Sequence, residues 1–374
     1  MTFNMKSIKY IVLLAAVFCF WACDHSEKIT PPQPKPELPV DWFAKGADVG
    51  WLTEMEAAGR KFYNSKGVET ECMTLMKDLG VNSIRLRAWV GPTDGWQGTE
   101  DLLIKAWRAH KLGMRIMIDF HYSDWWADPG KQIKPSAWLG KSLDELTIAL
   151  SDYTKDVLGQ LKAIGVTPEW VQVGNETTHG MLMHDSIDAN ENVTATDPAT
   201  SGGITLNGGA NYVKLNNAGY DAVKSVFPDA KVVVHVDRGH DEYYMTRMMN
   251  AMKNNNGKVD ILGLSLYPAK NNWQTLAENC VTNMQKMIDE YSVDVMLCEI
   301  GMDWQDAEEC GLFIEKMIRE TRVLKNSEGQ VKGHGVFYWE PESYNWNSYS
   351  KGAFTTDGTP TVAMDAFGID YTAE

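Results

Sequence analysis

Trp170-Val-Gln-Val-Gly-Asn175-Glu176 shows the organisation of this chain, because it is a short apolar run that ends in polar residues. Seven similar runs occur at 46–50, 83–89, 115–122, 231–236, 260–267, 294–298 and 335–339. Segments with the apolar spacing of helices lie between them, for example 68–79, 102–111, 143–164 and 307–323. Alternating strands and helices predict a parallel sheet, and eight such units allow the sheet to close.

We therefore expect an α/β fold, a single (β/α)8 TIM barrel with extended βα loops. An open, doubly wound sheet is the alternative architecture. It is disfavoured because Gly46-Ala-Asp-Val-Gly50 lacks the third glycine and the helix start of a phosphate-binding loop. The polar segment 184–209 is predicted to be a long loop after the fourth strand. No change in composition divides 41–374, so this range is expected to form one domain.

The composition excludes several classes of protein. The chain has 374 residues, of which 44% are hydrophobic and 14 are tryptophan, so it is neither disordered nor collagenous. Its formal net charge of −15 argues against a nucleic-acid-binding surface, because the phosphates of a nucleic acid would be repelled.

The N-terminal region has the features of an export signal. Lys6 and Lys9 precede an apolar run at 11–21, which is shorter than the roughly 20 residues of a membrane-spanning helix. Ala22 then precedes Cys23, so 1–22 is predicted to be a lipoprotein signal peptide and Cys23 the lipidated N-terminus. The alternative is a secretory signal that is cut nearby.

The proline-rich segment after Cys23 is predicted to be a spacer. Four prolines occur at 30–36, which prevents regular secondary structure, so 23–40 is expected to be a linker to the barrel at 41–374. We therefore expect an exported, membrane-anchored lipoprotein of the outer membrane and cell surface, with no contact to the membrane other than its lipid.

Four cysteines remain in the predicted barrel: Cys72, Cys280, Cys298 and Cys310. None forms a C-x-x-C pair, so buried thiols are expected rather than a metal site. A disulfide between Cys298 and Cys310 is left open, because disulfides persist outside the cell.

Carboxylates follow two of the predicted strands. Glu176 ends the fourth run and Glu299 ends the seventh. In a closed barrel the chemistry lies at the carboxyl ends of the strands, so these side chains are expected to converge. Two converging carboxyl groups are what glycoside hydrolysis requires, because one donates a proton while the other attacks or stabilises the sugar. The alternative is that each glutamate pairs with an arginine as structural support.

Three motifs carry a resemblance to a known family from about residue 45 to the C-terminus. They are Ser83-Ile-Arg85-Leu-Arg87-Ala-Trp89, Asp119-Phe-His121-Tyr122-Ser-Asp124-Trp125-Trp-Ala-Asp128-Pro129 and Val171-Gln-Val-Gly-Asn175-Glu176. They resemble glycoside hydrolase family 53, the arabinogalactan endo-1,4-β-galactosidases or endo-β-1,4-galactanases, within the clan of retaining barrel glycosidases. The resemblance implies internal hydrolysis of β-1,4-galactosidic bonds in galactan or type I arabinogalactan by double displacement.

The resemblance also implies roles for single residues. Glu176 is expected to be the general acid/base and Glu299 the nucleophile, while Arg85 or Arg87 keeps Glu299 ionised. Asn175 is expected to bind the sugar 2-hydroxyl. The two carboxyl groups are predicted to lie about 5–5.5 Å apart, as in retaining enzymes.

Further polar and aromatic residues near the strand ends suit a sugar cleft, because aromatic faces cover pyranose rings and polar groups bind hydroxyls. The predicted substrate-binding residues are Asn175, Arg85, Arg87, His121, Tyr122, Asp124, Trp125, His235, Asp237, Tyr267 and Trp339. His121 and His235 have an equally weighted alternative, in which they are buried and orient the two glutamates.

No cofactor is expected. The segment after Glu299 has few closely spaced oxygen ligands, so no calcium is predicted there. The expected partner is β-1,4-galactan or arabinogalactan polysaccharide, with no nucleic acid, and the chain is expected to be a monomer. Two other functions were weighed: another retaining barrel glycosidase such as a β-mannanase or β-glucanase, and a non-catalytic glycan-binding surface lipoprotein. The presence of both carboxylates disfavours the second.

Overall fold

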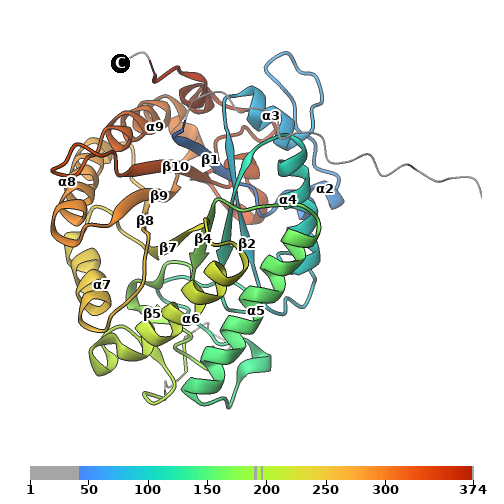
Figure 1. The fold of residues 1–374 in the computed structure, drawn as a ribbon. Helices are drawn as coiled ribbons and strands as arrows, with labels where there is room; N and C mark the ends of the chain where they lie inside the picture. Colours follow the sequence, from blue (N-terminus) through green and yellow to red (C-terminus); the bar gives the residue numbers. More distant parts are fainter. Residues whose placement is uncertain (1–41, 189–191, 195–196, 373–374) are drawn as a thin grey trace, which may run out of the picture. The chain divides into compact units, whose positions relative to one another are not determined.

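The structure, a computed structural model, describes residues 42–188, 192–194 and 197–372. The predicted signal peptide 1–22, Cys23 and the linker 23–40 lie outside the described residues. Eight parallel strands form a closed barrel in the order β1-β10-β9-β8-β7-β4-β3-β2 (Figure 1). The strands are β1 (Ala44–Asp48), β2 (Ser83–Ala88), β3 (Arg115–Phe120), β4 (Trp170–Val173), β7 (Lys231–Val236), β8 (Ile261–Leu266), β9 (Asp294–Ile300) and β10 (Gly333–Trp339). The predicted (β/α)8 barrel is confirmed, and the open sheet is excluded.

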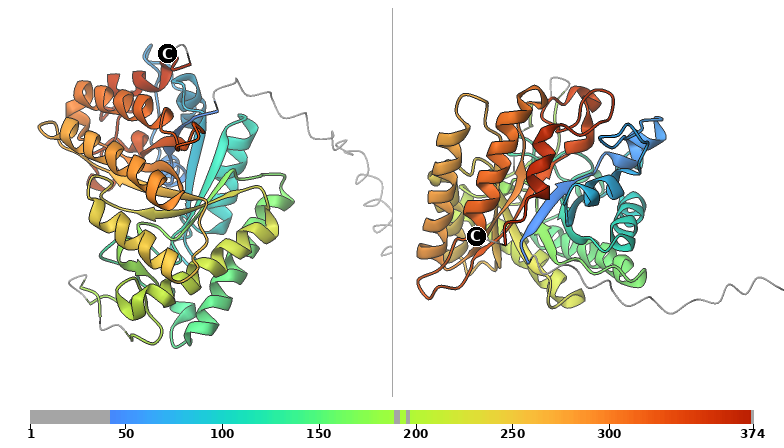
Figure 2. Two further views of the ribbon diagram at one scale, coloured as in Figure 1. Left: turned by 60° about the vertical axis from the view of Figure 1, so that its left-hand side comes forward. Right: turned by 90° about the horizontal axis from the view of Figure 1, so that it is seen from above.

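Helices surround this barrel (Figures 1 and 2). They are α2 (Leu52–Ala57), α3 (Cys72–Asp78), α4 (Thr99–Lys111), α5 (Leu143–Ala163), α6 (Ala210–Val226), α7 (Glu242–Asn254), α8 (Trp273–Tyr291) and α9 (Ala307–Arg322). Short 3-10 helices are η1 (Ser136–Trp138), η2 (Thr177–His179), η3 (Leu206–Gly209), η4 (Trp304–Asp306), η5 (Pro341–Ser343), η6 (Trp346–Ser348) and η7 (Val362–Gly368). The start of α5 is set locally by a capping box between Ser142 and Glu145.

The predicted loop 184–209 contains more structure than expected. β6 (Gly202–Gly203) pairs antiparallel with β5 (Gly180–Met181), and η3 leads directly into α6. A Cβ atom on Gly202 would lie 2.3 Å from the carbonyl oxygen of Met181, so this pairing depends on glycine. The apolar spacing of such a short pair is too weak to be recognised in the sequence.

Side chains alternate between two environments along each strand. Outward positions contact the helices, as Ile84 and Leu86 do in β2. Inward positions at the lower part of the barrel form a fully buried apolar cluster of Ala44, Met117, Trp170, Val233, Ile261, Met296, Cys298 and Phe337. Inward positions nearer the carboxyl ends are polar. The barrel interior is therefore apolar in its lower part and polar near the carboxyl ends of the strands.

The four cysteines of the barrel are buried and have free thiols. Cys298 lies in the apolar barrel cluster, whereas Cys310 belongs to the core outside the strands. The disulfide that the sequence left open between them is absent.

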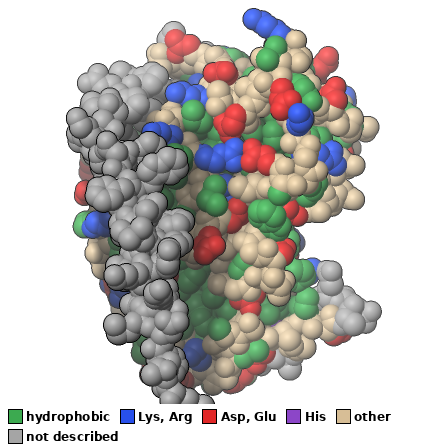
Figure 3. Space-filling view, turned by 90° about the vertical axis from the view of Figure 1, so that its right-hand side faces the viewer, with side chains coloured by type: hydrophobic (Ala, Val, Ile, Leu, Met, Phe, Trp, Pro, Cys, Tyr) green, Lys and Arg blue, Asp and Glu red, His purple; other side chains and the backbone are tan. Residues whose placement is uncertain are grey.

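The surface carries charges of both signs. On the face drawn in Figure 3, Lys and Arg side chains are interspersed with Asp and Glu. Exposed ion pairs include Lys258 with Asp221 at 2.7 Å, and such pairs contribute little to stability because water screens them. In the part of the chain that the structure describes, no helix is both long enough and apolar enough to cross a bilayer.

We predict that Gly46→Ala destabilises the barrel. The added Cβ would lie 2.1 Å from the ring of Phe337, which is fully buried in the apolar cluster of the barrel. Overpacking of this kind costs about 1–3 kcal/mol, so the midpoint of thermal or urea unfolding should fall. Gly159→Ala is the matched control, because it lies in α5 with no atom near the added Cβ. It should stabilise the protein by roughly 0.5–1 kcal/mol.

Candidate active site

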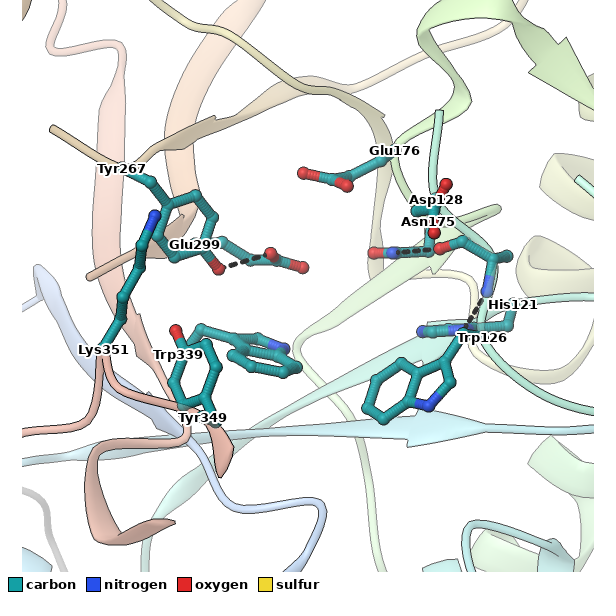
Figure 4. A pocket seen from close by; sticks show the side chains of 11 residues that line it. His121, Trp126, Asp128, Asn175, Glu176, Tyr267, Glu299, Trp339, Tyr349 and Lys351 are labelled. Carbon is teal, nitrogen blue, oxygen red and sulfur yellow. Dashed lines mark hydrogen bonds between the residues drawn. The ribbon is translucent and has the colours of Figure 1, made fainter. Parts of the chain in front are cut away.

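A pocket of about 290 Å³ opens at the carboxyl ends of the barrel strands (Figure 4). Both predicted catalytic residues, Glu176 and Glu299, line it, and Figure 4 shows their carboxyl groups pointing into the same space. The full lining is His121, Trp126, Ala127, Asp128, Asn175, Glu176, Tyr267, Glu299, Trp339, Tyr349 and Lys351. The expected convergence of the two glutamates is confirmed, while their predicted 5–5.5 Å separation stays a prediction.

A bulge in β9 places Glu299 in this pocket. Leu297 and Ile300 contact the core around the barrel, whereas Cys298 lies inside it. Strict alternation would therefore point Glu299 outward, on the same side as Leu297. The register of β9 against β8 shifts by one residue just before the pair Ser265 and Glu299. This extra residue is a β-bulge, which changes which side chains face inward. Glu299 therefore points into the barrel, as Cys298 does.

Two donors hold the carboxyl group of Glu299. Arg85 Nη1 lies 2.9 Å from Oε1, and the Tyr267 hydroxyl donates a hydrogen bond to Oε2 at 2.7 Å. Burial raises the pKa of Glu299, while the charge of Arg85 and the bond from Tyr267 act in the opposite direction. The sequence left two arginines as candidates for stabilising this carboxylate, and Arg85 is the one that contacts it, whereas Arg87 pairs with Asp48 and Glu340.

Arg85 is fully buried and is surrounded by acceptors. Its Nη1 lies 2.7 Å from Asp48 Oδ2, and its Nη2 lies 2.8 Å from Asp119 Oδ2. Nη2 also donates to Asn175 Oδ1 at 2.9 Å and to Gln172 Oε1 at 3.1 Å. Burial opposes the charge of Arg85, but the carboxylates around it raise its pKa well above the usual value. Arg85 therefore orients residues from several strands at once.

Arg87 lies behind the pocket rather than in it. Its guanidinium contacts the carboxylate of Glu340 and lies over the rings of Trp126, Trp51 and Trp339, at 4.5, 5.3 and 5.7 Å from their centroids. Glu340 also accepts a hydrogen bond from the backbone N–H of Trp51 at 3.1 Å. Only 1% of Arg87 is exposed. The structure therefore places Arg87 against the indole rings and outside the lining of the pocket.

Glu176 occupies a different electrostatic environment from Glu299. Its backbone has φ = 43°, in the left-handed region that glutamate seldom adopts, and its side chain is partly buried. Burial and the nearby charge of Glu299 raise the pKa of Glu176 well above its usual value. A hydrogen bond from Ser265 to Oε1 at 2.7 Å acts against this rise. The charge of Glu299 therefore favours the protonated form of Glu176, whereas the charge of Arg85 favours the carboxylate form of Glu299.

The two predicted histidines have different positions. His121 lines the pocket, and its Nδ1 accepts hydrogen bonds from the Trp89 indole at 3.2 Å and the Ala127 backbone at 3.1 Å. Its Nε2 therefore carries the proton that bonds to Asp119 at 3.1 Å. His235 is fully buried and does not line the pocket, so only its orienting alternative is compatible with this position.

Three other predicted binding residues line the pocket. Asn175 reaches it with its amide bonded to the carbonyl oxygen of Ala127 at 2.7 Å, as Figure 4 shows. Tyr267 and Trp339 form part of its wall. These residues bring an amide, a phenol and an indole ring to the two carboxyl groups.

Two predicted binding residues lie away from the pocket. The ring of Tyr122 stacks on Phe120 at 5.5 Å, and its hydroxyl bonds to Thr154 at 2.8 Å, so only 1% of Tyr122 is exposed. Asp237 bonds to the hydroxyl of Thr178 at 2.5 Å and does not line the pocket. Both side chains are engaged by neighbouring elements.

A second cavity adjoins the first. Asp124 and Trp125 line this space of about 230 Å³, together with Trp89 and Trp96. Trp126 lines both cavities. The two predicted residues are therefore next to the pocket that contains the two glutamates rather than inside it.

Sequence reasoning missed several residues of the site. On the inner face of the barrel, Arg85 is bound by Asp48, Asp119 and Gln172. Ser265 bonds to Glu176 from the same face. The sequence did contain a sign of these four residues, because each is a polar residue near the carboxyl end of a predicted strand. Tyr349 and Lys351 line the pocket from the segment after β10, where no periodic pattern marked them.

Within the described ranges, no group of three or more His, Cys, Asp or Glu side chains is arranged to hold a metal ion. The expectations of no calcium after the seventh strand and of no cofactor stay predictions.

The chain was compared with known proteins. Residues 44–368 match the sequence profile of glycosyl hydrolase family 53. The chain is 31% identical over 320 residues to arabinogalactan endo-beta-1,4-galactanase A of Aspergillus niger, covering 79% of this chain and 84% of that protein. It is 30% identical over 327 residues to the endo-beta-1,4-galactanase of Bacillus subtilis, covering 80% of this chain and 70% of that protein. A solved fungal β-1,4-galactanase structure matches with a TM-score of 0.73 at 25% identity, covering 87% of this chain and 98% of that one. The profile match and these relatives, together with the two glutamates in one pocket, show that the chain belongs to glycosyl hydrolase family 53.

Proposed function

We propose that this protein is an endo-β-1,4-galactanase that hydrolyses internal β-1,4-galactosidic bonds of galactan or arabinogalactan. The observation that carries the proposal is that Glu176 and Glu299 line one pocket and that, among the described residues, only Glu299 is contacted there by a guanidinium, that of Arg85. The substrate is supported by the galactanases among the similar proteins. The reaction is hydrolysis with retention.

The first step forms a bond between the sugar and the enzyme. The Glu299 carboxylate attacks the anomeric carbon, and the glycosidic bond breaks as Glu176 transfers its proton to the leaving oxygen. In the second step Glu176 removes a proton from water, whose oxygen attacks the same carbon and releases Glu299. Two inversions at one carbon give overall retention.

Electrostatics explain how Glu176 changes role between the steps. While Glu299 is a carboxylate, its charge adds to burial and keeps Glu176 protonated. Once Glu299 is esterified by the sugar, that charge is gone and the pKa of Glu176 falls. Glu176 is then able to accept the proton of the attacking water.

Other pocket residues hold the sugar ring. The Asn175 side chain is fixed between Arg85 and the carbonyl of Ala127, which suits it to bind the 2-hydroxyl. Trp126 and Trp339 offer indole surfaces, and each is in contact with Trp51 behind them. Because these rings are held by packing, they meet the sugar with little loss of side-chain entropy.

The alternative substrates are β-mannan and β-glucan, and the alternative function is glycan binding without catalysis. Product analysis on β-1,4-galactan, mannan and cellulose separates the substrates. Short oligomers released from galactan alone support the proposed endo activity, whereas galactose as the sole product indicates exo cleavage. Binding without any product would leave only the glycan-binding function.

We predict that Glu176→Gln and Glu299→Gln each lower kcat on galactan by at least about 100-fold. Glutamine removes the transferable proton in the first case and the nucleophilic charge in the second, while it preserves shape. Calorimetric binding of galacto-oligosaccharides should persist. Glu278→Gln, an exposed position on α8, is the matched control and should retain activity. Full turnover by both pocket variants would contradict the assignment.

We predict that the first product released from a β-galactan oligomer is the β-anomer. The predicted carboxyl separation of about 5–5.5 Å would leave no room for water behind the sugar, so it would allow only double displacement. Proton NMR of the anomeric signals, recorded before mutarotation, checks this. Early appearance of the α-anomer would require inversion and a wider separation.

We further propose that the protein is exported and attached to the membrane through a lipid on Cys23. The support is the charged start, the short apolar run and Ala22 before the cysteine. The proline-rich linker would hold the barrel away from the membrane, where a polysaccharide outside the cell is accessible.

We predict that Cys23→Ala moves the protein from the membrane fraction to the soluble fraction, because the lipidated thiol is lost. Detergent phase partitioning of fractionated cells measures this. Cys19→Ala is the matched control, since Cys19 lies within the removed signal and its variant should remain attached. Equal distribution of both variants in the soluble fraction would favour a plain secretory signal.

A further inference from the structure

A closed ring of hydrogen bonds surrounds the acid/base residue. The backbone N–H of Glu176 lies 3.3 Å from His235 Nδ1, and His235 Nε2 lies 2.8 Å from Ser265 Oγ. Ser265 Oγ in turn bonds to Glu176 Oε1 at 2.7 Å. The ring thus runs from the backbone of Glu176 through β7 and β8 and back to its own carboxyl group.

The direction of each hydrogen bond follows from the donors. A backbone N–H only donates, so His235 Nδ1 accepts from Glu176, as it does from the Gln172 amide at 3.1 Å. Because Nδ1 accepts this backbone N–H, the proton of a neutral His235 ring is on Nε2, and burial favours that neutral form by lowering the pKa of His235. Ser265 therefore accepts from His235 and has its own proton left for Glu176.

We propose that Ser265 is a positioning residue for the acid/base Glu176, holding its Oε1 so that Oε2 exchanges the proton with the substrate. The inference rests on the proposed function, because it assigns the acid/base role to Glu176. No other hydrogen bond to this carboxyl group occurs among the residues that the structure describes. Oε2 is therefore the oxygen that remains for the glycosidic bond.

The surroundings make this role hard to replace by water. Ser265 is 2% exposed and His235 is fully buried. Ser265 also pairs with Glu299 across the β8 and β9 register, immediately at the bulge that turns Glu299 inward. The same point of the sheet therefore sets the positions of both carboxyl groups.

The charges that face Glu176 come from several elements. Glu299 in β9, Asp237 after β7 and Asp128 after β3 all raise its pKa, in addition to burial. The hydrogen bond from Ser265 lowers it, because a donated bond favours the carboxylate. This bond also stabilises the charge that Glu176 acquires when it protonates the leaving group.

The test compares Ser265→Thr with Ser265→Val, which have the same shape but differ in the hydroxyl, alongside Ser265→Ala. We measure kcat/KM on galactan and on a dinitrophenyl β-galactobioside, whose leaving group needs no proton. On galactan, the Val and Ala variants should lose about 10- to 100-fold and Thr should recover most of the activity. On the aryl substrate all three should stay within about threefold of the wild type.

The pH profile gives a second readout. Activity on galactan falls as pH rises through the pKa of Glu176, because the acid form is lost. Removing the hydroxyl raises that pKa, so the alkaline limb of kcat/KM should move to higher pH in the Val and Ala variants and not in Thr.

The results on the two substrates and the pH profile together decide whether Ser265 positions Glu176. Equal losses on both substrates with an unmoved alkaline limb would mean that Ser265 only supports the fold and would overturn the proposal. Thermal unfolding of each variant identifies any that does not fold, and the Thr and Val pair then carries the comparison. Glu176→Ala separates this inference from the proposed function: if it loses no more activity on galactan than on the aryl substrate, the acid/base assignment itself fails.

Discussion

The buried positive charge of Arg85 is the constraint on which the site depends. A guanidinium removed from water is costly unless carboxylates and other acceptors surround it. In this barrel Asp48, Asp119 and Glu299 supply the charge, and Asn175 adds a neutral acceptor. Because these partners come from different strands, satisfying one arginine also aligns Glu299 with Asn175, the residue before Glu176.

The apolar cluster inside the barrel lies directly below the ion pairs of Arg85, and the two together fill the barrel interior. The cluster around Trp170 and Phe337 fills the barrel and excludes water beneath Arg85. Electrostatic interactions are stronger where water is excluded, so the contact of Arg85 with Glu299 has a larger effect on that carboxyl group than it would have in water. Arg87 and Glu340 form a second buried ion pair. The guanidinium of Arg87 lies over indole rings, whereas that of Arg85 contacts Glu299.

Much of the site was predictable because strand alternation is a local rule. Glu176, Asn175 and His121 follow or end runs whose inward positions are readable in the sequence. Tyr122 and Trp125 show the limit of this reasoning. They are close to His121 in the chain, yet one packs against Phe120 and the other lines a neighbouring cavity, since loop conformation decides where each ring points. The choice between Arg85 and Arg87 was equally undecidable, because both share one face of one strand.

The sequence by itself determined the eight alternating units, the closed barrel and the two strands that carry the glutamates. Hydrophobic periodicity and residue type are local properties, and they need no knowledge of distant contacts. Only the tertiary structure decided which way Glu299 points, because the extra residue in β9 appears only when the register against its neighbours is known. It likewise decided that Ser265 meets Glu176, since Ser265 lies in β8 and Glu176 follows β4, and the two come together only when the barrel closes.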